Sequence, residues 1–518
     1  MVIRTKLFFL FVVCYLSASG QSLPPKREFR GVWIASVMNI DWPSQAGLDA
    51  EKQRLEFLKT IQLHKANGMN AVVVQVRPSA DAFYPSRYEP WSKWLTGKLG
   101  KSPQPYYDPL EFMIKETHRL GLEFHAWFNP YRGVVNVEAH GVDSASLAFQ
   151  KPEWFVRYDK NLYFNPGLPE VRQHVTNVVM DVVTRYDVDG IHFDDYFYPY
   201  KVAKLSFPDS ATFAQYGKSF QHVDDWRRAN VDALIKAISD SVREAKPHVK
   251  FGVSPFGVWR NKDKDPTGSA TRAGQTCYDD LYADVLKWMR EGWIDYVTPQ
   301  IYWSIGFELA AYEVLVKWWN ENSNGKPVYI GQATYRINAH NDDRWKQGNQ
   351  IPNQIRLNRS LANIQGSTYF SSKSFVPNPL GINDSLKSSF YKYPALLPTQ
   401  HNKLFEANYP LSFTTDESGI TLHWREENAL KDLSPHRRYV IYRFDAGEKV
   451  NIEDPSKILA VLTDTNPHAT TVQRYTDQTA KLKRKYIYAV TSLNRFQVES
   501  STAQGYAVKK YKKYWRTY

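Results

Sequence analysis

Before residue 375 the chain switches eight times from a short apolar run to a helical pattern, and this alternation restricts its fold more than any other feature. Residues 71–76 form an apolar run of the kind that parallel sheets bury on both faces. Asp108 and Pro109 fit the N-cap and first position of a helix, which Gly121 closes. Eight β-then-α units predict an α/β fold, a (β/α)8 TIM barrel. A doubly wound sheet is the alternative, but its glycine-rich dinucleotide turn is missing. The expected strands span 30–34, 71–76, 123–128, 190–194, 249–255, 296–301, 328–331 and 366–370.

The pattern changes in the last quarter of the chain. Five prolines fall within residues 376–410, which we expect to be a linker after a barrel over 27–375. Beyond them the apolar residues alternate with period two, as in β-strands. Residues 411–510 are therefore expected to form a small all-β sandwich that resembles a fibronectin type III or immunoglobulin-like module. Its expected roles are packing against the barrel or extending a substrate groove.

Residues 1–20 have the pattern of a secretion signal peptide. Arg4 and Lys6 precede an apolar stretch over 7–16, which small residues follow. That stretch is too short to span a membrane, and no later stretch is apolar enough. Val13 is larger than the residue that a lipoprotein signal places before its cysteine, so no lipid anchor is expected. We expect an exported, soluble protein of the periplasm, cell surface or extracellular space.

Charge and composition narrow the expected partners. The formal net charge is +13, which favours polyanionic surroundings such as cell envelopes or acidic glycans. No nucleic-acid motif appears, so no nucleic-acid partner is expected. Cys14 and Cys277 are the only cysteines, and loss of the signal would leave no intrachain disulfide. Aromatic residues make up 15% of the chain, and flat rings suit the apolar C–H faces of sugars.

Two adjacent carboxylates, Asp194 and Asp195, stand where the fourth expected strand ends. Acids at the end of a buried strand are costly unless they are paired or used. In a barrel of parallel strands, catalytic residues gather at that end. A helix cap followed by a solvated loop acid is the alternative. We predict that Asp194 and Asp195 are catalytic, with His192 and Tyr196 at the substrate.

Amides, aromatic rings and a guanidinium stand at the ends of neighbouring strands. Such a set around two carboxylates predicts a cleft for a neutral or mildly anionic polyhydroxylated ligand. The amides and the guanidinium can instead be hydrogen-bond partners at the barrel mouth. The substrate-binding residues predicted in this way are Arg77, Trp127, Asn129, Gln300, Tyr302 and Trp303.

Four segments, in order, resemble the glycosyl hydrolase-like 10 family: 30–33, 129–132, 189–196 and 299–303. The resemblance covers residues 27–375. It implies an exported bacterial (β/α)8 glycoside hydrolase. One characterised branch of the family acts on peptidoglycan glycan strands stripped of their stem peptides, so the resemblance implies such a strand or another polysaccharide as partner.

Two catalytic mechanisms remain open at this point. Asp194 and Asp195 look like the acid pair of substrate-assisted N-acetylglucosaminidases, in which the first acid orients the 2-acetamido group and the second protonates the leaving oxygen. Tyr302 could then bind the acetamido group. In the rival mechanism two carboxyls stand about 5–10 Å apart across the scissile bond. Asp194 would be its nucleophile, and its partner would be one of Asp81, Asp279 and Asp280.

Two further functional classes share parts of this pattern. Metal-dependent deacetylases need two histidines about four residues apart, and the 13 histidines include no such pair suited to a metal beside the acids. No other cluster has convincing metal spacing, so neither metal nor cofactor is expected. A glycan-binding barrel without activity is the last alternative.

Overall fold

The computed structural model describes residues 23–399, 411–416, 419–424, 438–463, 472–481, 484–500, 504–511 and 514–517. The expected signal peptide over 1–20 therefore lies outside the described residues. No helix in these ranges is both long enough and apolar enough to cross a membrane.

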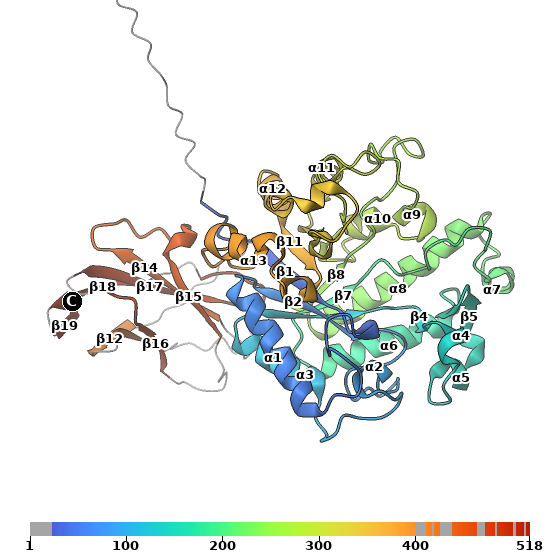
Figure 1. The fold of residues 1–518 in the computed structure, drawn as a ribbon, viewed down its shortest axis with the longest axis horizontal. Helices are drawn as coiled ribbons and strands as arrows, with labels where there is room; N and C mark the ends of the chain where they lie inside the picture. The colour runs from blue at the N-terminus through green and yellow to red at the C-terminus, as the bar shows by residue number, and fades with distance from the viewer. Residues whose placement is uncertain are drawn as a thin grey trace, which may run out of the picture.

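Eight parallel strands close into a barrel, which confirms the expected (β/α)8 fold (Figure 1). Around the barrel the strand order is β1-β11-β10-β9-β8-β7-β3-β2, so chain neighbours are mostly barrel neighbours. The strands are buried on both faces, as their apolar runs predict. Their bounds are β1 Phe29–Ile34, β2 Ala71–Arg77, β3 Glu123–Phe128, β7 Gly190–Phe193, β8 Lys250–Val253, β9 Tyr296–Val297, β10 Val328–Ala333 and β11 Ile364–Phe370.

Helices cover the outside of the barrel and return the chain from one strand to the next (Figure 1). The Asp108 side chain accepts hydrogen bonds from the first turn of α3, with Pro109 at the first helical position, as the sequence predicts. The main helices are α1 Ala50–Ala66, α3 Pro109–Arg119, α6 Pro169–Arg185, α8 Val223–Ala245, α10 Val285–Arg290, α11 Tyr312–Glu321 and α12 Gln350–Arg359.

A small antiparallel sheet, not foreseen from the sequence, interrupts the βα pattern after β3. It consists of β4 Arg132–Val134, β6 Asn161–Phe164 and β5 Phe155–Tyr158, in that order. The sheet brings the segment after β3 to the barrel mouth, where Arg132 lines the same cleft as Asp194 and Asp195.

Two antiparallel sheets follow the barrel, as expected for the C-terminal region. One has the order β12-β13-β16 and the other β15-β14-β17-β18-β19, with Trp424, Tyr439 and Tyr488 in the shared core. We call this unit the sandwich. Its strands are β12 Leu411–Asp416, β13 Gly419–Trp424, β14 Arg438–Asp445, β15 Ile458–Thr463, β16 Gln473–Asp477, β17 Lys485–Leu493, β18 Gln504–Tyr511 and β19 Tyr514–Thr517.

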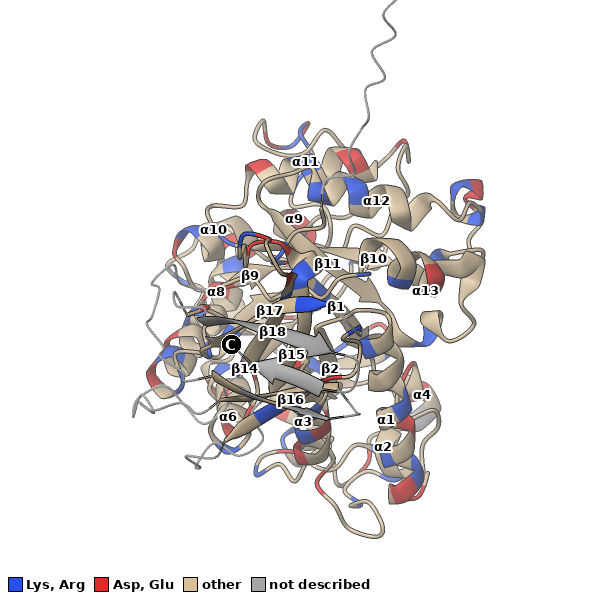
Figure 2. Cartoon of the chain, turned by 90° about the vertical axis from the view of Figure 1, so that its left-hand side faces the viewer, with Lys and Arg blue, Asp and Glu red and all other residues tan. Residues whose placement is uncertain are grey.

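The sandwich packs against the N-terminal ends of the barrel strands (Figures 1 and 2). Gln497 Nε2 donates to Glu123 Oε1, at the start of β3, over 2.9 Å. Lys26, just before β1, forms a 2.6 Å ion pair with Glu499. The strand ends that carry Asp194 and Asp195 are at the opposite end, so the sandwich packs on the barrel and does not extend a groove there.

Residues 376–399 of the expected linker lie against the barrel as short helical turns. These are η6 Pro379–Gly381, α13 Ile382–Ser385 and η7 Leu386–Phe390. Ile382, Leu386 and Phe390 are buried in the barrel's hydrophobic core. The barrel's hydrophobic core therefore includes apolar side chains beyond residue 375, from the segment between the prolines.

Candidate active site

A cavity of about 390 Å³ opens at the carboxyl ends of the barrel strands. Asp194 and Asp195 line it, and they are the only acidic residues among the described residues that do so. Neighbouring residues of a strand normally point to opposite faces. Because β7 ends at Phe193, both carboxylates lie beyond the regular strand and can face the same cavity.

Asp194 is held by donors on three sides. Its Oδ2 accepts from the indole of Trp127 at 3.2 Å and from the Asn129 amide, and its Oδ1 accepts from the Tyr196 backbone N–H at 3.0 Å. Burial raises the pKa of the Asp194 carboxyl, and the Arg132 charge and these three donors oppose the rise. Each donor favours the ionised form. Asp194 is therefore the carboxylate of the pair that is built to carry the charge.

Asp195 has the opposite setting. It is 2% exposed, and it accepts hydrogen bonds from the Tyr200 hydroxyl and, over 3.1 Å, from Gln300 Nε2. Burial, followed by the negative charge of Asp194, raises the pKa of Asp195 to about 7. Two adjacent carboxyls whose surroundings separate their protonation in this way suit an acid and a base.

Aromatic side chains form much of the remaining wall. Tyr196 and Tyr200 stack with ring centroids 5.1 Å apart, and the Arg132 guanidinium lies 4.7 Å from the Tyr196 centroid. Tyr302 and Trp303, from the segment after β9, also line the cavity. Flat rings and cations together suit a sugar chain that carries negative charge.

Of the predicted site residues, three lie outside the cavity lining. Arg77 is fully buried, with its Nε 2.8 Å from Glu89 Oε2 and its Nη2 2.5 Å from Glu89 Oε1. Asn129 lies behind Asp194, and Gln75 Nε2 donates to its Oδ1. His192 is 1% exposed, in the barrel interior. Seven predicted residues do line the cavity: Trp127, Asp194, Asp195, Tyr196, Gln300, Tyr302 and Trp303.

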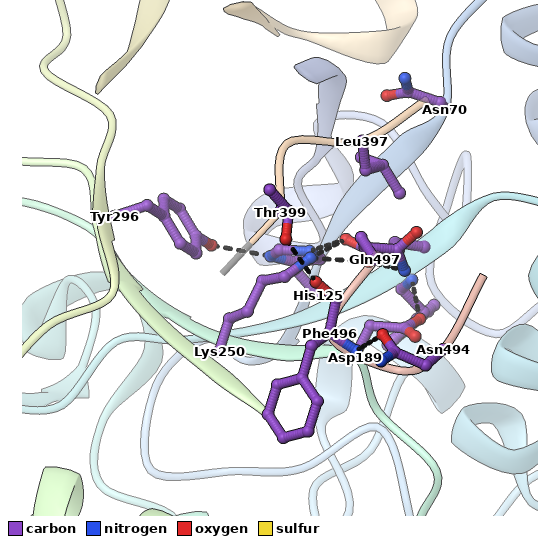
Figure 3. A network of polar contacts seen from close by, with 12 residues as sticks. Asn70, His125, Asp189, Lys250, Tyr296, Leu397, Thr399, Asn494, Phe496 and Gln497 are labelled. Atoms are coloured by element: carbon purple, nitrogen blue, oxygen red, sulfur yellow. Dashed lines mark hydrogen bonds and ion pairs between the residues drawn. The ribbon is translucent and has the colours of Figure 1, made fainter. Parts of the chain in front are cut away.

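His192 belongs to a hydrogen-bonded column through the barrel, and Figure 3 shows the step of that column between Tyr296 and His125. Indole N–H groups only donate, so Trp33 Nε1 donates to His192 Nε2 over 3.3 Å and leaves the ring proton on Nδ1. His192 Nδ1 then donates to the Tyr296 hydroxyl, 2.9 Å away, which donates to His125 Nδ1 at 2.7 Å. His125 Nε2 donates to Glu123 at 3.0 Å. The column runs from Trp33 at the cavity to the carboxylate that Gln497 reaches from the sandwich.

The column fits in the barrel interior because a glycine stands beside one of its rings. A Cβ atom on Gly252 of β8 would lie 2.0 Å from the Tyr296 ring, so only glycine fits there. Burial lowers the pKa of His192 well below its ordinary value, and the ring is neutral at neutral pH. Its contacts place His192 as a support for the cavity floor.

The carboxylates considered as partners in the rival mechanism lie elsewhere. Asp81 is 2% exposed, accepts from the Ser79 backbone N–H, and lines a separate cavity. Asp279 forms an ion pair with Arg260 at 2.9 Å, and Asp280 accepts from the Thr276 N–H at the start of a helix. None of the three lines the cavity of Asp194 and Asp195.

Several cavity residues were not among the predicted site residues. Each lies in the second half of a barrel strand or in the segment after one, and the rule that strand ends gather at one face selects such positions. Among the described residues, no group of three His, Cys, Asp or Glu side chains could hold a metal ion. The cavity residues outside the predicted set include Trp33, Gln75, Arg132, Tyr200, Ser254, Phe256, Tyr335, Arg336 and Phe370.

Comparison with known proteins agrees with this architecture. Residues 28–347 match the model of the glycosyl hydrolase-like 10 family. The chain is 47% identical over 485 residues to "Glycosyl hydrolase YngK" of Bacillus subtilis (strain 168), which covers 92% of this chain and 93% of that one. It is 38% identical over 368 residues to "Glycosyl hydrolase DigH" of Escherichia coli (strain K12), covering 66% of this chain and 83% of that one.

Among solved structures, the PgaB (BpsB) glycoside hydrolase domain from Bordetella bronchiseptica matches with a TM-score of 0.46 and 15% identity, over 70% of this chain and 98% of that one. The family match covers more than half of the chain, and the Bacillus relative spans nearly all of it. On this evidence the chain belongs to the glycosyl hydrolase-like 10 family.

Proposed function

We propose that this chain is an exported glycoside hydrolase that cleaves O-glycosidic bonds in N-acetylated cell-wall glycan, with peptide-free peptidoglycan strands as its substrate. The observation that carries the proposal is the division between the two cavity carboxylates. Asp194 is surrounded by donors, while Asp195 is protonated up to about pH 7. A pair of this kind can orient one group and protonate another.

The proposed reaction is substrate-assisted. Asp195 donates its proton to the glycosidic oxygen as the bond to the anomeric carbon breaks. The acetamido oxygen of the same sugar attacks that carbon and forms a cyclic oxazolinium ion, while Asp194 accepts a hydrogen bond from the acetamido N–H. Water, deprotonated by Asp195, then opens the ring. Two displacements at one carbon retain its configuration.

The absence of a third acid in the described cavity lining supports this route over the two-carboxylate alternative. Arg132 and Arg336 also line the cavity, and guanidinium groups bind carboxylates well. In a peptide-free strand, some sugars carry a free carboxylate. Such a strand therefore fits this lining better than a neutral polymer does.

The proposal is tested by incubating the protein with peptide-free glycan strands, peptide-bearing strands and a neutral chitin oligomer, and reading the products by mass spectrometry. We expect reducing-end fragments from the peptide-free strands first. A variant with Asp194→Ala and Asp195→Ala serves as the control that lacks the site. A polysaccharide without acetamido groups is the fourth substrate, and cleavage of that substrate alone would favour the two-carboxylate mechanism. No cleavage of any of the four would favour a non-catalytic glycan-binding barrel.

Activity should decline as the pH rises through about 7. The general acid must be protonated, and Asp195 loses its proton near that pH because burial and Asp194 raise its pKa. The measurement is kcat/KM against pH on the glycan that is cleaved. A rate still rising above pH 9 would contradict Asp195 as the acid.

Replacing Tyr302 with Phe should lower kcat by about 10²-fold, the cost of losing one donor to developing charge. Tyr302 lines the cavity, and both cavity carboxylates influence its hydroxyl. In the proposed reaction that hydroxyl donates to the acetamido oxygen, so a thiazoline mimic of the oxazolinium ion should also bind more weakly. The Tyr335→Phe variant, on a neighbouring ring 5.9 Å away, is the matched control. Equal inhibition of the Tyr302→Phe variant and the unmodified protein would exclude this contact.

A further inference from the structure

A second cavity, of about 420 Å³, lies between the barrel and the sandwich, at the end of the barrel opposite the carboxylate pair. We call it the interdomain cleft. Its barrel side comes from the end of α1 and from the segment around η7, and its sandwich side comes from β14 and β15. Figures 1 and 2 both place α1 and α13 beside the sandwich strands.

The interdomain cleft is lined by four basic residues: Lys65, Lys387, Lys392 and Arg438. No Asp or Glu is among its lining residues in the described part of the chain. Other cations at the junction have acidic partners, since Lys26 pairs with Glu499 at 2.6 Å and Arg495 with Asp187 at 2.7 Å. The four cleft cations form no ion pair with any described residue. They therefore differ from the other cations at this interface, which are neutralised by acidic side chains.

Arg438, the first residue of β14, is the most buried of the four basic residues. It is 9% exposed, and within the described chain its guanidinium has no hydrogen-bond partner. The carboxylate of Asp189 is within its electrostatic reach, but His118 already binds that carboxylate at 2.7 Å. No Arg438 nitrogen is both fully buried and unpartnered, so the guanidinium reaches the open cleft. A cation that is largely removed from bulk water and has no acidic partner favours a bound anion.

The Lys65 ammonium lies on the barrel side of the interdomain cleft, near the end of α1. A Cβ atom on Gly121, another lining residue, would lie 3.7 Å from Lys65 Nζ. Although much of Lys65 is exposed, surrounding protein atoms and the positive charge of Arg438 lower its pKa to about 8. Lys65 and Arg438, one from each folded unit, thus repel each other across a space that holds no acid.

We propose that the interdomain cleft binds phosphate, either as a free ion or as a group of a phosphodiester polymer. A phosphate group presents several acceptor oxygens and more negative charge than one carboxylate, which suits an arginine with three lysines around it. Because the cations come from both units, the bound anion would join the sandwich to the barrel. The site is separate from the carboxylate pair, so this proposal does not depend on the proposed glycan cleavage.

Calorimetry with inorganic phosphate and with a poly(glycerol phosphate) chain tests the proposal. The test variant is Lys387→Gln with Lys392→Gln, two exposed residues whose loss leaves the packing intact. Lys59→Gln with Lys115→Gln removes the same charge from exposed positions on α1 and α3 and is the matched control. A third variant, Arg438→Gln, removes the buried cation.

We expect the test variant and Arg438→Gln to weaken binding by about tenfold or more, while the control stays within about twofold of the unmodified protein. Binding of inorganic phosphate would identify a site for a single group, and binding of the polymer alone a site that needs several. No binding of either probe, or equal loss in the test and control variants, would overturn the proposal.

Discussion

Replacing Asp195 with Asn should lower kcat by about 10²- to 10⁴-fold and leave KM nearly unchanged. The amide keeps the size of the side chain and can still face Tyr200 and Gln300, but it has no proton to give to the leaving oxygen. The loss should shrink on an aryl glycoside whose leaving phenol needs little protonation. Initial rates on the natural glycan and on the aryl glycoside measure both effects.

Asp279→Asn is the control for this experiment, because Asp279 is paired with Arg260 outside the cavity. We expect nearly full activity from it. If Asp279→Asn were as damaging as Asp195→Asn, the two-carboxylate mechanism would gain its missing partner. An Asp195→Asn variant with full turnover of the natural glycan would exclude Asp195 as the acid.

The Asp195→Asn variant should also be more resistant to unfolding than the unmodified protein at pH 8. The folded pKa of Asp195, about 7, is above that of an unfolded aspartate, about 4. The folded state therefore holds this proton more tightly, and the stability it contributes at low pH is lost as the pH rises through 7. Asn carries no charge at any pH. Thermal melts of both proteins at pH 4 and pH 8 measure this gain in stability. They also show whether the variant is folded, so that lost activity is not mistaken for misfolding.

The barrel could be predicted from the sequence because each of its strands has a recognisable local pattern of apolar residues. The expected strand over 123–128 coincides with β3, since a strand that is buried on both faces is apolar nearly throughout. The sheet of β4, β5 and β6 was missed because its strands are only 3 or 4 residues long and their apolar residues do not alternate. Asp159 has a φ of 53°, which is typical of a tight hairpin turn.

The site was predictable only in part, because the direction of a side chain depends on partners far along the chain. Asp194 and Asp195 face the cavity, as their position after β7 predicts. Arg77 also ends a strand, but Glu89 draws its guanidinium into the interior. The docking of the sandwich rests on pairs such as Gln497 and Glu123, which are 374 residues apart. No local pattern encodes such a pair.

The largest loss of stability is expected from Lys250→Met. Lys250 Nζ lies 2.7 Å from both carboxylate oxygens of Glu123, and both residues are almost fully buried. Without Lys250, the Glu123 charge keeps only the neutral donors His125 and Gln497. Removing one partner of a buried ion pair costs about 3–5 kcal/mol. Urea unfolding, followed by fluorescence and with the slope unchanged, measures this difference.

The double variant Glu123→Gln with Lys250→Met should recover much of that loss, because it leaves no unpaired charge in the barrel. The cycle of the two single variants and the double variant isolates the coupling between the residues. Lys236→Met breaks the exposed pair with Asp240 and should change the free energy of unfolding by about 0.5 kcal/mol or less. If Lys250→Met were equally mild, the Glu123 carboxylate would have to be protonated in the folded protein. The hydrogen-bonded column from Glu123 to Trp33 would then need a different arrangement of protons.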